Sequence, residues 1–185
     1  MKILRMILMG FSLLYFSGCA FYYQPRVIRP IEEIQEFSSN NSVTLINGQP
    51  STEQVFFVSG GQVNLSKPYA NLRTWTDTTI NIAERELTKR GLHVLEEAPK
   101  SLTMSIESAK TDVGWVVVTS QIAMLVETSD GYSATYIGKD KSSYYFHLLY
   151  YPVFGDTFLR GLNTALMRVA VAMLNDPQII AFLSK

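Results

Sequence analysis

The sequence predicts an α+β domain in which two principal helices pack on one face of a mainly antiparallel sheet. Two segments, one central and one C-terminal, carry apolar residues at three- and four-residue steps, which is the period of an amphipathic helix. Shorter segments rich in β-branched and aromatic residues lie around them, and an Asp-Gly pair joins two of these as a hairpin. A set of strands accompanied by helices favours a two-layer arrangement around one core.

The clearest helix is expected over residues 71–90. Lys89 and Arg90 suit the negative end of a helix, and Gly91 is well placed to cap it in the left-handed conformation. We expect Trp75 to point into the core between this helix and the sheet. The apolar face consists of Leu72, Trp75, Thr79, Ile82, Ala83 and Leu87.

A second helix is expected near the C-terminus, capped at its start by Asp156 or Thr157. The sequence Asn175-Asp176-Pro177 should end this helix and begin a short one, because proline is well tolerated in the first helical turn. The apolar face of the longer helix consists of Phe158, Leu162, Ala165, Leu166, Val169 and Met173.

Six strands are expected, over residues 43–46, 54–59, 92–95, 101–109, 115–127 and 132–137. Asn47-Gly48 and Asp130-Gly131 are turn signals. Leu102, Met104 and Ile106 alternate with polar residues, so their side chains should share one face of the sheet.

The start of the chain reads as a bacterial lipoprotein signal. Lys2 and Arg5 precede an apolar run over residues 6–16, which suits a signal peptide and falls short of the roughly 20 residues that span a bilayer. The sequence Phe16-Ser17-Gly18-Cys19 then resembles the lipobox, whose cysteine receives a diacylglyceryl group before cleavage. Phe16 departs from the usual leucine of that box. An ordinary secreted protein with a chance cysteine at this place is the alternative.

The lipobox resemblance implies that Cys19 is the lipid attachment site, with diacylglyceryl and N-acyl (palmitate-type) chains as the only covalent group and no other cofactor. Residues 1–18 are then the signal peptide, 19–41 the lipidated cysteine with a tether lying partly along the domain, and 42–185 a periplasmic α+β domain. Several acyl chains on one residue hold a protein stably on a membrane. Ala20, in place of the aspartate that retains enterobacterial lipoproteins, implies the outer membrane, with the inner membrane as the alternative.

Several motifs together resemble the YajG-type bacterial lipoproteins. They are the lipobox, the tether, the helix ending in Lys89-Arg90-Gly91, the Asp-Gly hairpin, and the C-terminal sequences 173–176 and 180–183. This family has no established enzymatic activity, so the resemblance implies a fold and an envelope location and no catalytic role. Residues 139–155 are longer and more aromatic than that pattern.

The sequence shows no catalytic or metal-binding motif. His93 and His147 are the only histidines, and neither has a partner at a metal-ligand spacing that makes a credible motif. Glu96-Glu97 reads as a solvated acidic pair in a loop. Sixteen basic residues balance sixteen acidic ones, without the basic excess that nucleic-acid binding requires. We therefore expect no enzyme and no nucleic-acid partner, although a Ser-His-Asp triad assembled from distant residues stays open as a third hypothesis.

Residues 144–154 are the unusual segment, because six of the eleven are aromatic. These aromatics either form one or two strands that fill the core or provide an exposed surface for a partner. The candidate partner-binding residues are Tyr144, Tyr145, Tyr150 and Tyr151. The favoured function is a lipid-anchored accessory or scaffold protein that binds another component of the cell envelope. The alternative is a carrier of a small apolar ligand in a pocket between helices and sheet.

Overall fold

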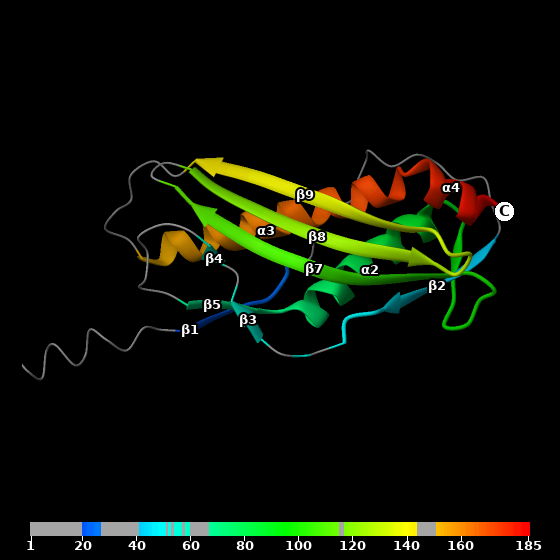
Figure 1. Cartoon of the computed structure of the whole chain (residues 1–185), viewed down its shortest axis with the longest axis horizontal. Helices are drawn as coiled ribbons and strands as arrows, with labels where there is room; N and C mark the ends of the chain where they lie inside the picture. Colours follow the sequence, from blue (N-terminus) through cyan, green and yellow to red (C-terminus); the bar gives the residue numbers. More distant parts are fainter. Residues whose placement is uncertain are drawn as a thin grey trace, which may run out of the picture.

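The computed structural model describes residues 20–26, 41–50, 52, 54–56, 58–59, 67–114, 117–143 and 151–185. The molecule is elongated, with the C-terminus at one end of its long axis (Figure 1). Its main sheet has the strand order β6 (His93–Val94), β2 (Ser42–Asn47), β7 (Ser101–Val113), β8 (Val117–Thr128) and β9 (Ser133–Ser143). A further strand, β4 (Val58–Ser59), pairs with β7 beside this path.

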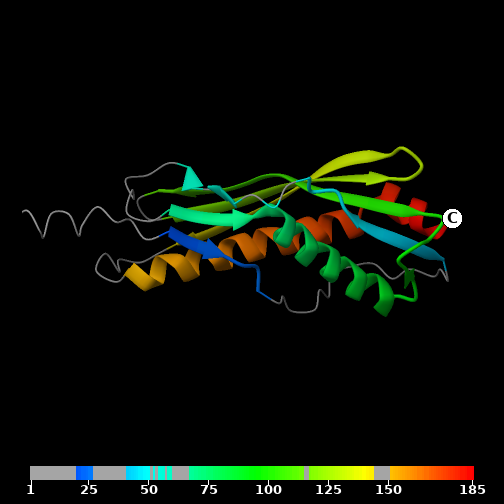
Figure 2. The same cartoon turned by 90° about the horizontal axis from the view of Figure 1, so that it is seen from below.

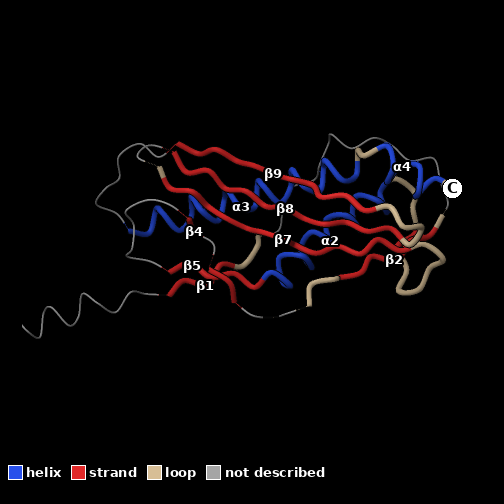
Figure 3. The backbone as a smooth tube through the Cα atoms, viewed as in Figure 1, coloured by secondary structure: helices blue, strands red, loops and turns tan. Residues whose placement is uncertain are grey.

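The sheet is mixed in direction. Its three longest strands, β7, β8 and β9, run antiparallel and follow one another along the chain. By contrast, β2 runs parallel to both β6 and β7, and β4 runs parallel to β7. The predicted antiparallel arrangement is therefore confirmed for the three long strands that make up most of the sheet, and the short parallel strands beside them make the sheet mixed (Figure 3).

Two long helices, α2 (Leu72–Lys89) and α3 (Tyr151–Leu174), lie on the same face of this sheet (Figure 2). A short helix, α4 (Pro177–Ser184), follows at the C-terminus. The opposite face of the sheet is not covered by any described helix. This arrangement confirms the predicted α+β fold, with two principal helices on one face.

A separate small sheet has the order β1 (Ala20–Tyr23), β5 (Lys67–Asn71) and β3 (Gln54–Phe56). The single strand expected over residues 54–59 is thus divided, because β3 joins this small sheet while β4 joins the main one. Residues 20–23, expected as part of a tether, form a strand that pairs in parallel with β5. The described structure of the domain therefore begins at Ala20.

Helix α2 begins and ends within one residue of the predicted boundaries. Asn71 caps its start by accepting a hydrogen bond from the Thr74 N–H, over 3.1 Å. At its end, Gly91 has a φ of 86°, and the N–H groups of Gly91 and Leu92 donate to the carbonyls of Thr88 and Leu87. These two bonds are a Schellman ending, which confirms the left-handed cap.

The core faces the helices, as the apolar patterns predict. Trp75 is only 2% exposed, and the helix residues packed with it include Ile82, Ala83 and Leu87. Leu102, Met104 and Ile106 of β7 are all buried on this same side, which confirms their predicted common face.

Helix α3 begins earlier than predicted. It starts at Tyr151, so Asp156 and Thr157 lie inside the helix and not at its start. A proline in the first turn, Pro152, suits this earlier start because its missing N–H would have no helical partner there. The end of the helix agrees with the prediction, since Asp176 caps α4 by accepting from the Gln178 N–H over 2.7 Å.

Strand β7 contains a β-bulge between Ile106 and Ser108, where the register with β8 shifts by one residue. The extra residue is Glu107. Before it the even-numbered side chains are buried, and after it Thr111 and Val113 are buried instead. At this point the side-chain oxygen of Gln49 accepts a hydrogen bond from the Ile106 N–H over 2.8 Å. Gln49 follows β2, so the loop after β2 helps to hold the bulge in place.

Candidate functional site

Most of the residues that the sequence singled out for function lie outside the described part of the chain. This holds for Cys19, Tyr144, Tyr145, Tyr150 and His147, whose predicted roles stay predictions. Tyr151 is the first residue of α3. The interpretation of residues 144–154 as strands is therefore wrong from Tyr151 onward, where the backbone is helical because the helix starts five residues before Asp156, the first of its two expected caps.

The described candidates for chemistry are dispersed. His93 is exposed on β6, and Glu96 and Glu97 are exposed in the loop that follows. Within the described residues, no group of three His, Cys, Asp or Glu side chains is placed to hold a metal ion.

The chain immediately after Cys19 is fixed to the domain in two places. Strand β1 starts at the next residue, Ala20, which pairs with Lys67, and the pairing continues to Tyr23 opposite Ala70. Three residues later the Arg26 N–H donates to the Asn163 side chain of α3, over 3.2 Å. Strand β5, which holds β1, leads directly into α2 through Asn71. The predicted lipid position therefore borders a folded element rather than a long free linker.

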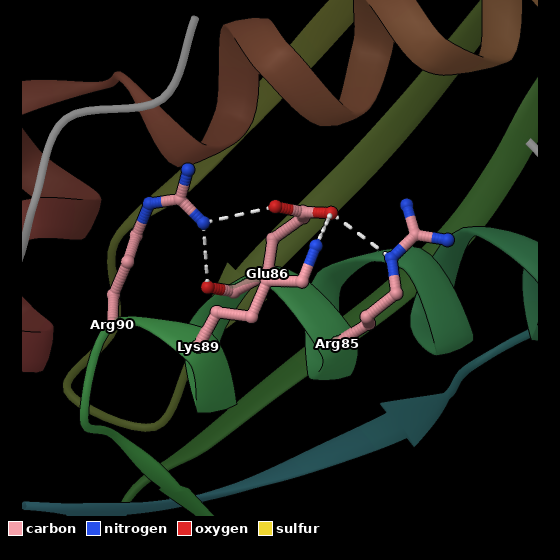
Figure 4. Close-up of polar contacts among 4 residues, drawn as sticks. All are labelled: Arg85, Glu86, Lys89 and Arg90. Atoms are coloured by element: carbon pink, nitrogen blue, oxygen red, sulfur yellow. Dashed lines mark hydrogen bonds and ion pairs between the residues drawn. The ribbon is translucent and has the colours of Figure 1, made fainter. Parts of the chain in front are cut away.

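A buried carboxylate lies near the end of α2 (Figure 4). Glu86 is 1% exposed, and one of its oxygens lies 2.9 Å from Arg85 Nε and 3.4 Å from Lys89 Nζ. The other oxygen lies 2.9 Å from an Arg90 guanidinium nitrogen, which also donates to the Glu86 carbonyl over 2.8 Å. Because three cations of the same helix meet this one carboxylate, we interpret the cluster as a structural ion-pair network at the helix end.

A second acidic centre joins the start of β9 to the α3–α4 junction. Asp176 accepts hydrogen bonds from the Tyr136 hydroxyl over 2.7 Å and from the Tyr132 hydroxyl over 3.0 Å. Partial burial by itself would raise the pKa of Asp176, but the bonds from Tyr136, the Gln178 N–H and Tyr132 outweigh it and hold this pKa below its usual value. Burial, followed by the bond to Asp176, raises the pKa of Tyr136 above its usual value.

Helix α3 approaches the sheet very closely through glycine. A Cβ added to Gly138 of β9 would lie 1.9 Å from the Ala165 carbonyl oxygen, and one added to Gly161 would lie 2.6 Å from Ser120 Oγ. Ser120 in turn lies 3.3 Å from the Thr111 hydroxyl, with both residues buried. At these points helix and strand leave no space for an apolar ligand between them.

Sequence reasoning missed both acidic centres, although each leaves a signal. Glu86 follows Thr79, Ile82 and Ala83 at helical steps, so it belongs to the buried stripe of α2 despite its charge. Asp176 was expected only to separate two helices. Its two tyrosine partners lie 40 and 44 residues away and could not be inferred from local pattern.

No single helix in the described ranges is both long and apolar enough to cross a membrane. Residues Thr157–Leu174 and Pro177–Ser184 pass that test only as a pair, and the pair is bent by 58°.

Comparisons with known proteins connect the chain to solved structures and not to sequences. No protein-family model and no curated protein sequence matches it. The lipoprotein GNA1162 from Neisseria meningitidis matches with a TM-score of 0.34 and 10% identity, over 63% of this chain and 94% of that one. A neuraminyllactose-binding hemagglutinin homologue from Helicobacter pylori matches with a TM-score of 0.38 and 10% identity, over 84% and 96%.

A third match is closer in shape. The protein XCC0632 from Xanthomonas campestris, of the DUF330 family, superposes with a TM-score of 0.58 over 88% of this chain and 96% of that chain, at 13% identity. Of these three structures, it alone has a TM-score high enough to indicate a common fold. The resemblance to YajG-type lipoproteins stays a prediction. The chain therefore shares the fold of this DUF330 structure over most of its length.

Proposed function

We propose that this protein is a non-catalytic lipoprotein of the bacterial envelope, held on a membrane through Cys19, that binds another envelope component as an accessory or scaffold. The observation that supports it most is the position of Cys19, which ends a lipobox-like sequence and directly precedes a strand of the domain. The proposed location is the periplasmic side of the outer membrane.

The uncovered face of the main sheet supports a binding role. Side chains on this face include Ile137, which is 52% exposed, and Ile46, which is 40% exposed. Between them lie polar groups such as Thr135, which donates to Glu107 across the sheet over 3.1 Å. A surface with isolated apolar side chains among polar ones suits a reversible protein contact.

The alternative role as a carrier receives less support from the described residues. A carrier of an apolar ligand needs a cavity between helices and sheet. The glycine contacts of α3 bring its backbone against β8 and β9 at two separate places, Gly138 and Gly161. We therefore place binding on the surface of the domain rather than inside it.

The anchor is tested by replacing Cys19 with serine in the full chain. We expect fatty-acid labelling to disappear and the protein to remain uncleaved or to become soluble in the periplasm. If the Cys19→Ser chain still carries labelled lipid in the membrane fraction, the proposed attachment site is wrong.

The binding role is tested by a photo-cross-linking residue introduced at Ile137 in the lipidated protein in whole cells. We expect one discrete adduct. The matched control is the same residue at Glu84, which is exposed on α2. Equal adducts at both positions, or none at Ile137, would contradict binding through the open face. The adduct should also weaken in the Cys19→Ser chain, because the anchor raises the local concentration of membrane-bound partners.

A further inference from the structure

We infer that the domain stands on the membrane in a fixed pose, with the end that carries the start of β1 against anionic phospholipid and the β8–β9 turn pointing away. This inference rests on the proposed lipid at Cys19. It assigns a membrane-facing surface to the end of the domain where β7 and β9 finish and β8 begins.

Almost no chain separates the proposed lipid from the folded domain. Cys19 is followed at once by β1, whose four residues are all in register with β5. A flexible linker would separate lipid and domain by roughly 5–6 Å times the square root of its length, but here that length is close to zero. The proposed acyl chains are therefore attached to the residue that directly precedes β1.

The position of β1 decides which end of the domain lies near the membrane. Both views place β1 and the first turn of α3 at one end of the long axis, and α4 with the C-terminus at the other (Figures 1 and 2). Strand β9 ends at Ser143 on the β1 side, and its start at Ser133 follows the turn on the far side. Ten residue steps separate these two serines, which is roughly 33 Å in a β-strand. An anchor at β1 thus brings Ser143 close to the bilayer and holds Ser133 away from it.

The two ends of the domain also differ in their charged residues. Toward the β1 end, the last residues of β7 and β9 include three lysines and two aspartates, and the Asp140 carboxylate lies 3.8 Å from an Arg168 nitrogen. Toward the far end, the loop after β6, the end of β8 with its turn, and the C-terminal residue carry four carboxylates and two lysines, while Glu86 and its three cations lie on the helix side of the sheet. An anionic membrane surface attracts basic groups that lie within about 10 Å of it. The near set is Lys110, Asp112, Lys139, Asp140 and Lys141, and the far set is Glu96, Glu97, Lys100, Glu127, Asp130 and Lys185.

The three lysines near the membrane end lie on one face of the main sheet. Lys110 and Lys139 both stand opposite Gln121 of β8, and Lys141 stands opposite Thr119. All three lysines are exposed, so they belong to the uncovered face of the sheet near the membrane end. In this pose the rest of the uncovered face, including Ile137, lies above the bilayer and faces parallel to the membrane plane. A membrane-bound partner can reach it there.

The pose is tested with single cysteines in the full, lipidated protein. Cys19 is the only native cysteine, and its thiol is consumed by the lipid, so Ser143→Cys and Ser133→Cys each give one reactive thiol. Both serines are exposed on the same strand. Each variant carries a fluorophore in vesicles of phosphatidylethanolamine and phosphatidylglycerol that contain headgroup spin-labelled lipid. We expect strong quenching at residue 143 and little at residue 133.

A linker variant is the matched control. A Gly/Ser insertion of about 16 residues between Cys19 and Ala20 would separate lipid and domain by roughly 22 Å and should abolish the difference between the two positions. Equal quenching in the protein without the linker, or stronger quenching at residue 133, would overturn the pose. Mass spectrometry of Cys19 separates the two hypotheses. A chain without lipid would reject the proposed function together with this inference, whereas a lipidated chain with equal quenching would reject the inference alone.

The lysines are tested in the same vesicles. Replacing Lys139 and Lys141 by glutamine should reduce quenching at residue 143, while replacing Lys100 and Lys185 at the far end should leave it unchanged. If both pairs behave alike, the electrostatic part of the pose is wrong.

Discussion

Helices α2 and α3 cover the same face of one sheet, but they contact it in different ways. Helix α2 packs through large side chains, above all Trp75 and Leu87, which are almost fully buried. Helix α3 instead brings its backbone against β9 at Gly138, where a Cβ would meet the Ala165 carbonyl. Truncation of a side chain should therefore damage the contact of α2, whereas enlargement of a residue should damage the contact of α3.

The largest expected effect is the truncation of Trp75. Replacing it by alanine should lower the free energy of unfolding by about 3–5 kcal/mol, through lost burial and the cavity left behind. Chemical denaturation monitored by circular dichroism measures this change. Glu84→Ala, on the exposed side of the same helix, should cost less than about 0.5 kcal/mol. A Trp75→Ala protein with unchanged stability would place this helix face in solvent.

Enlargement of Gly138 should have the next largest effect. Gly138→Ala introduces a Cβ at 1.9 Å from a backbone oxygen, so α3 or β9 must move, at a cost of about 1–3 kcal/mol. The adjacent Ile137→Ala changes more atoms than Gly138→Ala does. It should nevertheless destabilise the protein less, because Ile137 is 52% exposed. The comparison of the two helices fails if Ile137→Ala is the more destabilising of the pair.

A smaller effect is expected at the end of α2. Gly91→Ala should cost about 1 kcal/mol, because alanine is strained at a φ of 86°. Thr88→Ala, in the last turn and exposed, should leave the denaturation midpoint close to that of the wild type. Equal midpoints for Gly91→Ala and the wild type would show that the left-handed cap adds nothing to stability.

An effect of similar size concerns the hydrogen bonds from two tyrosines to Asp176, which join the start of β9 to the end of α3. At neutral pH, Tyr136→Phe should cost about 1 kcal/mol, because it removes one donor to a charged acceptor. The pKa of Asp176 is lowered in the folded protein, so its contribution is present above about pH 4 and is lost as the pH falls through the folded value. The pKa of Tyr136 is raised, so its contribution is present below about pH 10 and is lost as the pH rises further.

Urea denaturation of wild type and Tyr136→Phe at several pH values checks both directions. The difference between the two proteins should be largest near neutrality and should shrink in acid. A difference that stays constant from neutral to acidic pH would show that the charge of Asp176 has no part in this contact.

The contrast between the two helices also explains what the sequence could predict. Helix α2 depends on local signals, and two of them, the apolar period and Gly91, predict the helix and its C-terminal cap from the sequence. The contact at Gly138 depends on Ala165, which lies 27 residues later in the chain, and glycine in a strand does not reveal what approaches it. The start of α3 was misplaced because Asp156 and Thr157 are good capping residues wherever they occur.

Strand pairing shows the same limit. The β8–β9 hairpin was predicted because its turn, Asp130-Gly131, lies between its strands, and Gly131 has the positive φ that such turns favour. The parallel pairing of β2 with β7 joins residues 57 positions apart, such as Thr44 and Ser101, and no local pattern encodes it. The division of residues 54–59 between two sheets is likewise decided by tertiary contacts.

The bulge at Glu107 has a consequence for how this strand can change over time. Because it reverses which parity is buried, β7 consists of two half-strands of opposite hydrophobic phase, joined at one inserted residue. Loss of Glu107 alone would turn Thr111 and Val113 toward solvent and Lys110 and Asp112 toward α3. A compensating insertion later in the strand would restore only the residues beyond it. The two halves of β7 can therefore change by substitution without disturbing each other's alternation, but neither can gain or lose a single residue without reversing it.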